Sequence, residues 1–192
     1  MVSSENTDRY IIDTSSILSQ KDNEPHRRSI NKTLWKHIDE LIGELERAGF
    51  EVDITTLDKS RRCSTEVCEY VSNKLGIEIM SFGTNPGSVI WVDENASRVL
   101  EDPSIIKLVY KGASRYTFRA MNWSYSKGDT VDAACVILTD DFEKLADDSF
   151  STNRISVVTL NRLYVAMTRS RGNLYLMRFS TFKKIRDSYI KV

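Results

Sequence analysis

Three short segments of the sequence carry residues whose types suit the binding of phosphate. They hold Arg62 in LDKSRRCS, the pair Lys127–Gly128 in SYSKGD, and Arg169 in YVAMTRS. A guanidinium presents a planar fork of N–H donors to phosphate oxygens, so arginine suits this task better than lysine. A glycine lets the backbone approach a phosphate or sugar closely, and a neighbouring lysine adds positive charge. Each of these residue groups, taken alone, is also common in surface loops and helix ends, so its function depends on the pattern around it.

Arg169 follows an amphipathic stretch. Within Leu160–Arg171, LNRLYVAMTRSR, apolar residues recur at i, i+3, i+4 and i+7, which predicts a helix with one stripe facing a core. We expect the helix to end over Thr168–Arg171 with Gly172 as its C-cap, and a buried strand to follow over Asn173–Phe179. A single arginine at a helix end is commonly a surface residue favoured by the helix dipole. Any function of Arg169 therefore depends on the residues around it.

Those residues, YVAMTRS at 164–170, resemble motif VI of the UvrD-like superfamily 1 helicases, which runs YVAxTRA before a strand. In that family ATP lies between two RecA-like domains, and an arginine of the second domain reaches the γ-phosphate. The resemblance implies that Arg169 is this catalytic arginine, which neutralises the charge that builds up during phosphoryl transfer. It also implies that the chain is the second, C-terminal motor domain of an ATP-dependent DNA helicase.

The segment Leu57–Ser64 resembles motif IV of the same family, L-x-x-N-Y-R-S, which lies between a strand and a helix. The resemblance gives Arg62 the role of a second catalytic and ATP-binding arginine. Ser60 stands where the family has Asn. Arg61 replaces the Tyr that stacks on adenine in the family, although a guanidinium can also stack on a base. A competing register places a weaker form of the motif at residues 27–29, just before a long predicted helix.

The segment Ser124–Leu138, SYSKGDTVDAACVIL, resembles motif V, T-x-H-x-[SA]-K-G-x-E-[FY]-D-x-V. The loop of that motif touches both single-stranded DNA and the nucleotide. The resemblance implies contacts from five loop residues, with the DNA from Ser124, Ser126 and Lys127 and with the nucleotide from Gly128 and Thr130. Three positions depart from the family, whose Thr, His and Glu are replaced by Asn122, Ser124 and Thr130.

The parts of an ATPase that grip the nucleotide are missing from the sequence. No G-x-x-x-x-G-K-[ST] occurs in it. Asp93–Glu94 follows an apolar run but lies between the motif IV-like and motif V-like segments, so we interpret it as a strand end and not as a Mg²⁺ site. We predict that this chain alone neither binds ATP tightly nor hydrolyses it. ATP with Mg²⁺ would need a first RecA-like domain, in cis or in trans.

Two other functions stay open. The substitutions at Arg61, Ser124 and Thr130 favour a degenerate RecA-like module that binds nucleic acid or a protein partner without working as a motor. The stretch Arg9–Leu18, RYIIDTSSIL, predicts a strand ending at Asp13, and it resembles either a worn helicase motif III or the opening of a PIN nuclease. A PIN site needs several carboxylates converging on divalent metal, and Asp13 alone stands in such a position. An ordinary turn started by an Asp explains Asp13 equally well.

Strands and helices alternate along the chain, which favours an α/β fold. We predict a single RecA-like domain over residues 1–192, a three-layer sandwich with a mostly parallel sheet and helices on both faces, in which residues 1–30 are partly loop. Further helices are expected over Asn31–Ala48, Ser64–Leu75, Glu94–Leu100 and Phe182–Ile190. Further strands are expected over Phe50–Leu57, Ile77–Met80, Val89–Val92, Ile105–Tyr110, Tyr116–Trp123 and Ala133–Leu138.

Composition limits the other function classes. Of 192 residues 41% are apolar, and no run approaches the ~18 apolar residues of a membrane span. Cys63, Cys68 and Cys135 form no C-x-x-C pair and the chain has two histidines, so neither a metal site nor a disulfide framework is expected. The first residues lack the apolar centre of a signal peptide, which predicts a cytoplasmic protein with no membrane partner. Net charge is zero, but residues 162–192 hold eight Lys/Arg against one acid, a basic end that could follow phosphates or be a solvated face.

Overall fold

The computed structural model describes residues 9–11, 40, 42–49, 51–53 and 59–191. The chain divides into two compact units, Met1–Lys59 and Ser60–Val192, each of which is described by itself. The single domain expected from the sequence stays a prediction. Asp13 and residues 27–29, on which the motif III-like, PIN-like and alternative motif IV-like interpretations depend, lie outside the described residues.

The described part of the first unit contains a small parallel strand pair and the end of a helix. β1 (Arg9–Ile11) pairs in parallel with β2 (Glu51–Asp53). Residues 42–47 are helical, and Gly49 follows them with a φ of 87°. A left-handed glycine of this kind commonly ends a helix, which agrees with the helix end predicted at Ala48.

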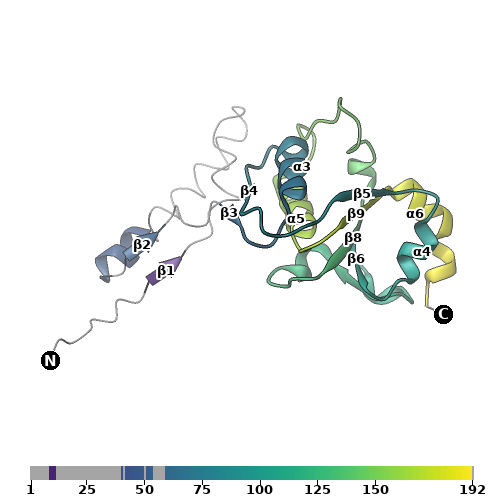
Figure 1. The fold of residues 1–192 in the computed structure, drawn as a ribbon, viewed down its shortest axis with the longest axis horizontal. Helices are drawn as coiled ribbons and strands as arrows, with labels where there is room; N and C mark the ends of the chain where they lie inside the picture. Colours follow the sequence, from purple (N-terminus) through teal and green to yellow (C-terminus); the bar gives the residue numbers. More distant parts are fainter. Residues whose placement is uncertain (1–8, 12–39, 41, 50, 54–58, 192) are drawn as a thin grey trace. The chain divides into compact units, whose positions relative to one another are not determined.

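The second unit is built on a five-stranded sheet in the order β5-β9-β8-β6-β7, in which every neighbouring pair is parallel (Figure 1). The strands are β5 (Val89–Val92), β6 (Ile105–Val109), β7 (Ala120–Asn122), β8 (Ala133–Ile137) and β9 (Leu174–Met177). Because the strands are parallel, their amino ends lie at one edge of the sheet. The loops that hold Lys127 and Arg169 precede β8 and β9, and therefore meet at that edge.

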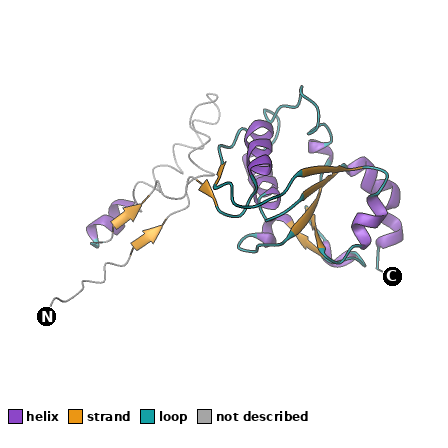
Figure 2. Cartoon of the chain, viewed as in Figure 1, coloured by secondary structure: helices purple, strands orange, loops and turns teal. Residues whose placement is uncertain are grey.

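Helices cover both faces of this sheet (Figure 2). On one face pack α3 (Thr65–Leu75) and α5 (Val157–Met167), whose buried residues join one apolar cluster. On the other face pack α4 (Ala96–Glu101) and α6 (Phe179–Ile185), whose buried residues join a second cluster. The unit is therefore α/β, with a parallel sheet between two helix layers, which confirms the predicted fold class and is consistent with a RecA-like domain.

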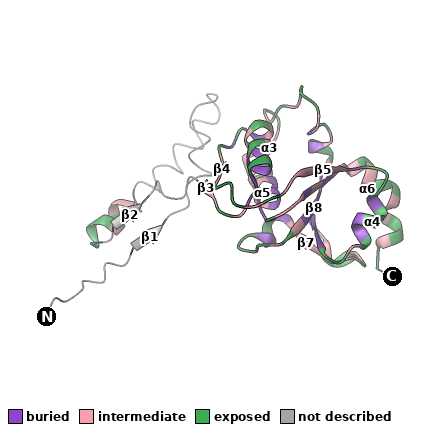
Figure 3. Cartoon of the chain, in the orientation of Figure 1, coloured by how far each residue is buried: buried purple, intermediate pink, exposed green. Residues whose placement is uncertain are grey.

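The two apolar clusters arise because successive residues of a strand point to opposite faces of the sheet. The cluster under α3 and α5 takes Ile106, Leu108, Ala134, Val136, Leu174 and Leu176 from the strands. The cluster under α4 and α6 takes Ile105, Val109, Cys135, Ile137 and Met177. The central strands are thus buried on both faces, as is usual in parallel sheets (Figure 3).

Shorter elements connect these layers. They are β3 (Lys59–Ser60), β4 (Met80–Ser81) and the 3₁₀ turns η2 (Ala113–Arg115), η3 (Trp123–Ser126), η4 (Asp140–Phe142) and η5 (Arg186–Tyr189). The strand predicted over Tyr116–Trp123 is wrong in length, because only β7 pairs with the sheet. The last helix was predicted to begin at Phe182, but α6 begins at Phe179. Phe182 lies in its first turn and is buried in the core.

The ends of α3 and α5 follow local capping rules. Ser64 caps α3 by accepting from the Val67 N–H (3.2 Å), as predicted from the sequence. Ser156 caps α5 in the same way through the Thr159 N–H (3.1 Å), so α5 starts three residues before the predicted Leu160. Its C-cap is Thr168.

Gly172, predicted as the C-cap of α5, has another role. A Cβ at this position would lie 2.7 Å from the carbonyl oxygen of Asp132, and the Gly172 N–H donates to that oxygen (2.9 Å). Gly87 is similarly tight, because a Cβ there would lie 2.3 Å from the carbonyl oxygen of Gly172. The prediction was wrong because the sequence could not show that three backbone segments pack together here without side chains.

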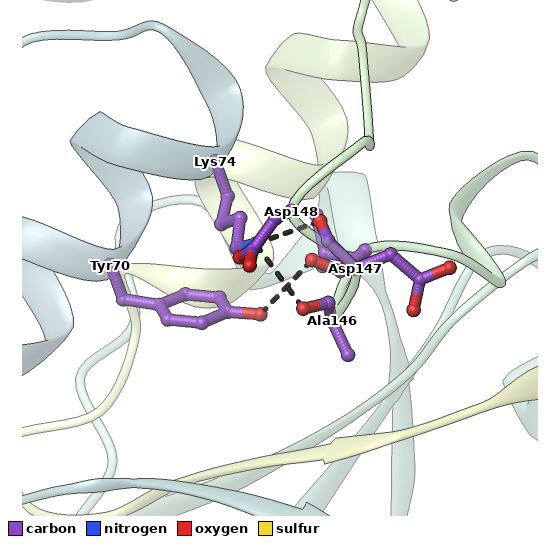
Figure 4. Close-up of polar contacts among 6 residues, drawn as sticks. Tyr70, Lys74, Ala146, Asp147 and Asp148 are labelled. Atoms are coloured by element: carbon purple, nitrogen blue, oxygen red, sulfur yellow. Dashed lines mark hydrogen bonds and ion pairs between the residues drawn. The ribbon is translucent and has the colours of Figure 1, made fainter.

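The acidic segment Asp140–Asp148, which follows β8, is hydrogen-bonded to α3 (Figure 4). The Lys74 ammonium donates to the carbonyl oxygens of Ala146 (3.3 Å) and Asp147 (2.9 Å) and lies 3.8 Å from the Asp148 carboxylate. The Tyr70 hydroxyl donates to the Leu145 carbonyl oxygen (3.4 Å). These contacts hold the acidic segment beside α3.

Candidate anion-binding site

Arg62 is placed by a loop that is fixed on both sides. The Ser60 hydroxyl accepts from the backbone N–H groups of Arg62 (3.2 Å) and Cys63 (3.0 Å), directly before Ser64 caps α3. From the other side, the Asn85 amide donates to the carbonyl oxygens of Arg61 (2.6 Å) and Arg62 (2.8 Å). All backbone groups that flank the Arg62 side chain are therefore engaged, which limits the directions in which it can point.

The Arg62 guanidinium joins two loops that are distant in sequence. Its Nε donates to the Thr130 hydroxyl (2.8 Å), and its Nη1 donates to the Thr168 carbonyl oxygen (3.0 Å). Thr130 belongs to the motif V-like loop, and Thr168 ends α5 directly before Arg169. The three segments that the sequence singled out for phosphate chemistry thus meet at Arg62.

Arg169 lies beside this contact and is 9% exposed. Its Nε donates to the Val165 carbonyl oxygen (2.8 Å), and its Nη2 donates to the Thr168 hydroxyl (3.3 Å). A third, longer bond runs from Nη1 to the carbonyl oxygen of Ser126 (3.5 Å). Burial and then the positive charge of Arg62 lower the pKa of Arg169, which places the two guanidinium groups within electrostatic reach of each other.

No carboxylate lies within ion-pair distance of either guanidinium among residues 59–191. Neither Arg62 nor Arg169 forms an ion pair there, and the negative charge of Asp129 has the weakest influence on Arg169. Each guanidinium carries five N–H donors. The structure engages two donors of Arg62 and three of Arg169. Two adjacent cations with unused donors form an arrangement that favours an anionic ligand.

The motif V-like loop is anchored from inside the domain. Trp123 is fully buried, and its ring N–H donates to the Leu108 carbonyl oxygen (3.0 Å). Ser126 is also buried, and its hydroxyl donates to the Trp123 carbonyl oxygen (2.7 Å). The side chain of Ser126 therefore points into the protein, while its carbonyl oxygen serves Arg169. The predicted contact of Ser126 with nucleic acid stays a prediction. In the arrangement described here, the buried hydroxyl of Ser126 does not face a ligand.

The remaining residues of that loop face solvent. Ser124, Lys127, Gly128 and Thr130 are exposed, and Gly128 has a φ of 95°, which favours glycine. Tyr125 between them is 76% exposed, and neither Tyr125 nor Lys127 contacts a polar or aromatic partner among the described residues. The loop thus offers an aromatic ring and a cation next to Arg62 and Arg169.

Sequence reasoning did not identify several residues that build the site. Asn85 lies in the loop GTNPG and Ser60 was noted only as a departure from motif IV, yet both hold the Arg62 backbone. Cys63, to which the sequence assigned no metal site or disulfide, donates to the same Thr168 carbonyl oxygen as Arg62 (3.5 Å). A small polar residue two positions before a functional arginine was the available signal, because such residues fix turns.

Arg61, which stands where motif IV would have a Tyr, contacts an aromatic side chain of its own domain. The Arg61 guanidinium lies 4.4 Å from the ring centre of Phe82, which is 46% exposed. A guanidinium over an aromatic face is favourable electrostatically. Arg61 is therefore engaged by Phe82 within the domain, next to Arg62 in the chain.

An open cleft of about 640 Å³ adjoins the site through Thr130. It lies at the amino ends of the central strands, and its polar lining comes from Ser104, Arg119, Thr130, Asp132 and Asn173. Asp93, at the carboxyl end of β5, pairs with Arg178 (3.0 Å), in agreement with its interpretation as a strand end. In the part of the chain that the structure describes, no group of His, Cys, Asp and Glu is arranged to hold a metal.

None of the helices among the described residues has the length and apolar character needed to cross a membrane.

Comparison with known proteins gives structural neighbours alone. No family model matches the sequence, and no curated protein matches it. Among solved structures, the chain is similar to arterivirus nonstructural protein 10, a helicase in complex with DNA, with 16% identity, a TM-score of 0.42, and coverage of 67% of this chain and 27% of that one. It is also similar to the PRRSV nsp10 helicase, with 17% identity, a TM-score of 0.40, and coverage of 76% and 28%. The chain thus spans about a quarter of the length of these helicases.

Proposed function

We propose that residues 60–192 are the second motor domain of an ATP-dependent helicase, and that Arg62 and Arg169 act on a triphosphate held by a first RecA-like domain. One observation carries the proposal. Two guanidinium groups, which are 107 positions apart in the sequence, both bond to Thr168, Arg62 through its carbonyl oxygen and Arg169 through its hydroxyl. Neither has a carboxylate partner among residues 59–191. Such a pair is unfavourable without an anion, because each charge raises the energy of the other.

The chemistry follows from the donors. In phosphoryl transfer, negative charge is spread over the oxygens of the transferred group, and arginine stabilises that charge without moving a proton. Arg62 is the more available of the two, since three of its donors have no partner among the described residues. Arg169 is held by three bonds, so it would offer a fixed direction with fewer free donors. Gly128 and Thr130 stand beside them, where close approach to a ribose or phosphate is sterically open.

The chain's residues cover only part of the reaction. The sequence contains no G-x-x-x-x-G-K-[ST], and the described residues contain no metal-holding group, so another domain would hold ATP and Mg²⁺, in cis or in trans. Lys127 and Ser124, with Tyr125 between them, would face single-stranded DNA on the exposed side of the motif V-like loop. Cationic and aromatic side chains together bind a strand through its backbone and its bases.

A binding experiment tests the anion site without the partner domain. Pyrophosphate at low ionic strength should raise the melting temperature of the full chain, because a ligand that binds only the folded state stabilises it. Arg62→Met and Arg169→Met should each abolish this rise. Arg171→Met is the matched control, since Arg171 is an exposed arginine two positions away whose side chain makes no ion pair among the described residues. Equal loss in all three variants, or no rise in the wild type, would contradict the proposal.

A second experiment tests the motor role. A first RecA-like domain with an intact phosphate-binding loop, mixed with or fused to this chain, should hydrolyse ATP faster than it does alone. The increase should be lost with Arg169→Lys, because a point charge does not replace the planar fork of arginine. ATP hydrolysis by the purified chain alone, if it were lost on Arg169→Ala, would contradict the proposal that a second domain must hold the ATP.

A non-motor module is the second candidate, and one observation favours it. Thr130 replaces the Glu expected at the ribose, and its hydroxyl accepts from Arg62 within the domain. A module of this kind would respond to pyrophosphate and bind single strands, yet it would give no ATP turnover with any first domain. The reconstitution experiment therefore separates the two candidates.

A further inference from the structure

We infer that Cys63 and Cys68 form an oxidisable dithiol at the start of α3, and that a peroxide converts it to an intramolecular disulfide. The residues are five positions apart, so their spacing matches no C-x-x-C motif. Neither thiol touches the ligand in the proposed function, although Cys63 donates to the Thr168 carbonyl oxygen that also accepts from Arg62. The inference does not depend on ATP or nucleic acid.

The helix start brings the two thiols together. Ser64 is the N-cap of α3, so Cys63 precedes the cap and Cys68 is the fourth helical residue. Side chains at these two positions pack against each other at many helix starts. Both cysteines are almost fully buried, at 1% and 2% exposure, in the same apolar cluster. Each thiol has the largest influence on the pKa of the other, which agrees with neighbouring positions in this cluster.

The surroundings distinguish the two sulfur atoms. The Cys68 thiol, the Ser60 hydroxyl and the charges of Arg62 and Arg169 lower the pKa of Cys63 to about 7, against the effect of burial. The Cys63 thiol, together with burial, raises the pKa of Cys68. A thiolate near the positive end of a helix and beside arginine is the usual form of a reactive cysteine. Cys63 is therefore the attacking thiolate, and Cys68 is the thiol that resolves it.

The oxidation balances with a peroxide as the oxidant. The Cys63 thiolate attacks one oxygen of hydrogen peroxide, the O–O bond breaks, and the leaving hydroxide takes a proton to become water. Cys63 is then a sulfenic acid. The Cys68 sulfur attacks the Cys63 sulfur, the S–O bond breaks, and the hydroxide leaves with the proton of Cys68 as a second water. Two thiols lose two electrons, and the peroxide gains them.

The disulfide would change the contacts of the arginine site. The Cys63 thiol donates to the Thr168 carbonyl oxygen (3.5 Å), which also accepts from Arg62 (3.0 Å). A disulfide has no S–H, so oxidation removes the first of these bonds and draws the sulfur toward Cys68. Oxidation of Cys63 would therefore shift the loop that carries Arg62, the next residue before it in the chain.

Cys135 is an internal control. It is fully buried in the central strand β8, and burial raises its pKa to about 12. β8 is paired on both sides, with β6 and β9, whereas the buried Cys63 lies in the loop before α3, two positions after the exposed Arg61. Local opening of loops is far more frequent than global unfolding. Reagents should therefore reach Cys63 and leave Cys135 untouched.

The test uses the full chain at neutral pH with hydrogen peroxide, followed by non-reducing peptide mapping. We expect a Cys63–Cys68 linked peptide lighter by two hydrogen atoms, with Cys135 still reduced. In Cys68→Ala, Cys63 should instead accumulate as a sulfenic acid that dimedone traps. If Cys68→Ala does not fold, iodoacetamide labelling of the wild type at different pH values provides the second measurement. The rate at Cys63 should rise with pH through a midpoint of about 7, because the thiolate is the reacting form.

Three results would overturn the inference: a labelling midpoint near the ordinary thiol value of 9.0, equal reaction of Cys135, or a disulfide that joins Cys135 to either partner. Each is independent of the pyrophosphate response, so failure of the dithiol and failure of the anion site are distinguishable.

Discussion

Replacement of Gly87 by alanine is the most direct test of how the fold positions the arginine site. Gly87 has a φ of 152°, and a Cβ there would lie 2.3 Å from the carbonyl oxygen of Gly172 and 2.6 Å from the carbonyl carbon. Both atoms are backbone, so no side chain can rotate away. Gly172 is three residues after Arg169, and a displaced Gly172 would move the segment that carries this arginine.

The expected loss of stability has two parts. A non-glycine residue held in a backbone conformation of this kind costs about 1–3 kcal/mol. Overpacking in a tight region costs about 1–3 kcal/mol more, because the backbone of Gly172 must shift. We therefore expect Gly87→Ala to lower the free energy of unfolding by about 2–6 kcal/mol. The pyrophosphate response should weaken as well, since the arginine segment is displaced.

The measurement is the melting temperature by calorimetry, with Gly83→Ala as the matched control. Gly83 also has a positive φ, 72°, but a Cβ there would meet no atom closer than 4.0 Å. Its expected cost is the left-handed conformation alone, about 1–2 kcal/mol. One kcal/mol shifts the melting temperature by roughly 2–8 °C over the size range that includes this unit. Equal melting temperatures for Gly87→Ala and Gly83→Ala would refute the steric argument.

Three further changes have distinct expected outcomes. Ser64→Ala removes the cap that accepts from the Val67 N–H and should destabilise the unit by about 1 kcal/mol, measured by urea unfolding; an unchanged midpoint would contradict the cap. Trp123→Phe leaves the Leu108 carbonyl oxygen without its donor and should cost about 1–3 kcal/mol in the same assay, whereas a neutral result would mean that the bond is replaced. Lys127→Ala, at an exposed loop position, should change stability by less than about 0.5 kcal/mol, yet it should reduce the salt dependence of single-strand binding by about one phosphate contact. An unaltered dependence of single-strand affinity on salt concentration would mean that Lys127 does not contact the strand.

Local signals in the sequence determined most of the elements. Ser64 before an apolar stripe predicted a helix as far as Leu75, and the structure places Ser64 as the N-cap of α3 and Gly76, which the sequence analysis did not identify, as its left-handed C-cap (φ 65°). The parallel sheet also followed from short apolar runs between helices. These predictions hold because caps, turns and amphipathic stripes depend on residues within one or two turns of each other.

Only the tertiary structure shows which residues surround the two arginines. The bond from Arg62 to the Thr168 carbonyl oxygen joins residues 106 positions apart, and the bond to Thr130 spans 68 positions. The sequence proposed the same arginines from their motifs but could not show that they share one backbone segment. It also assigned Gly172 to a helix end, where the structure uses it for close packing of three backbone segments. Contacts of this range depend on the packing of the two helix layers on the sheet, which is a property of the whole unit and is not encoded at any single position.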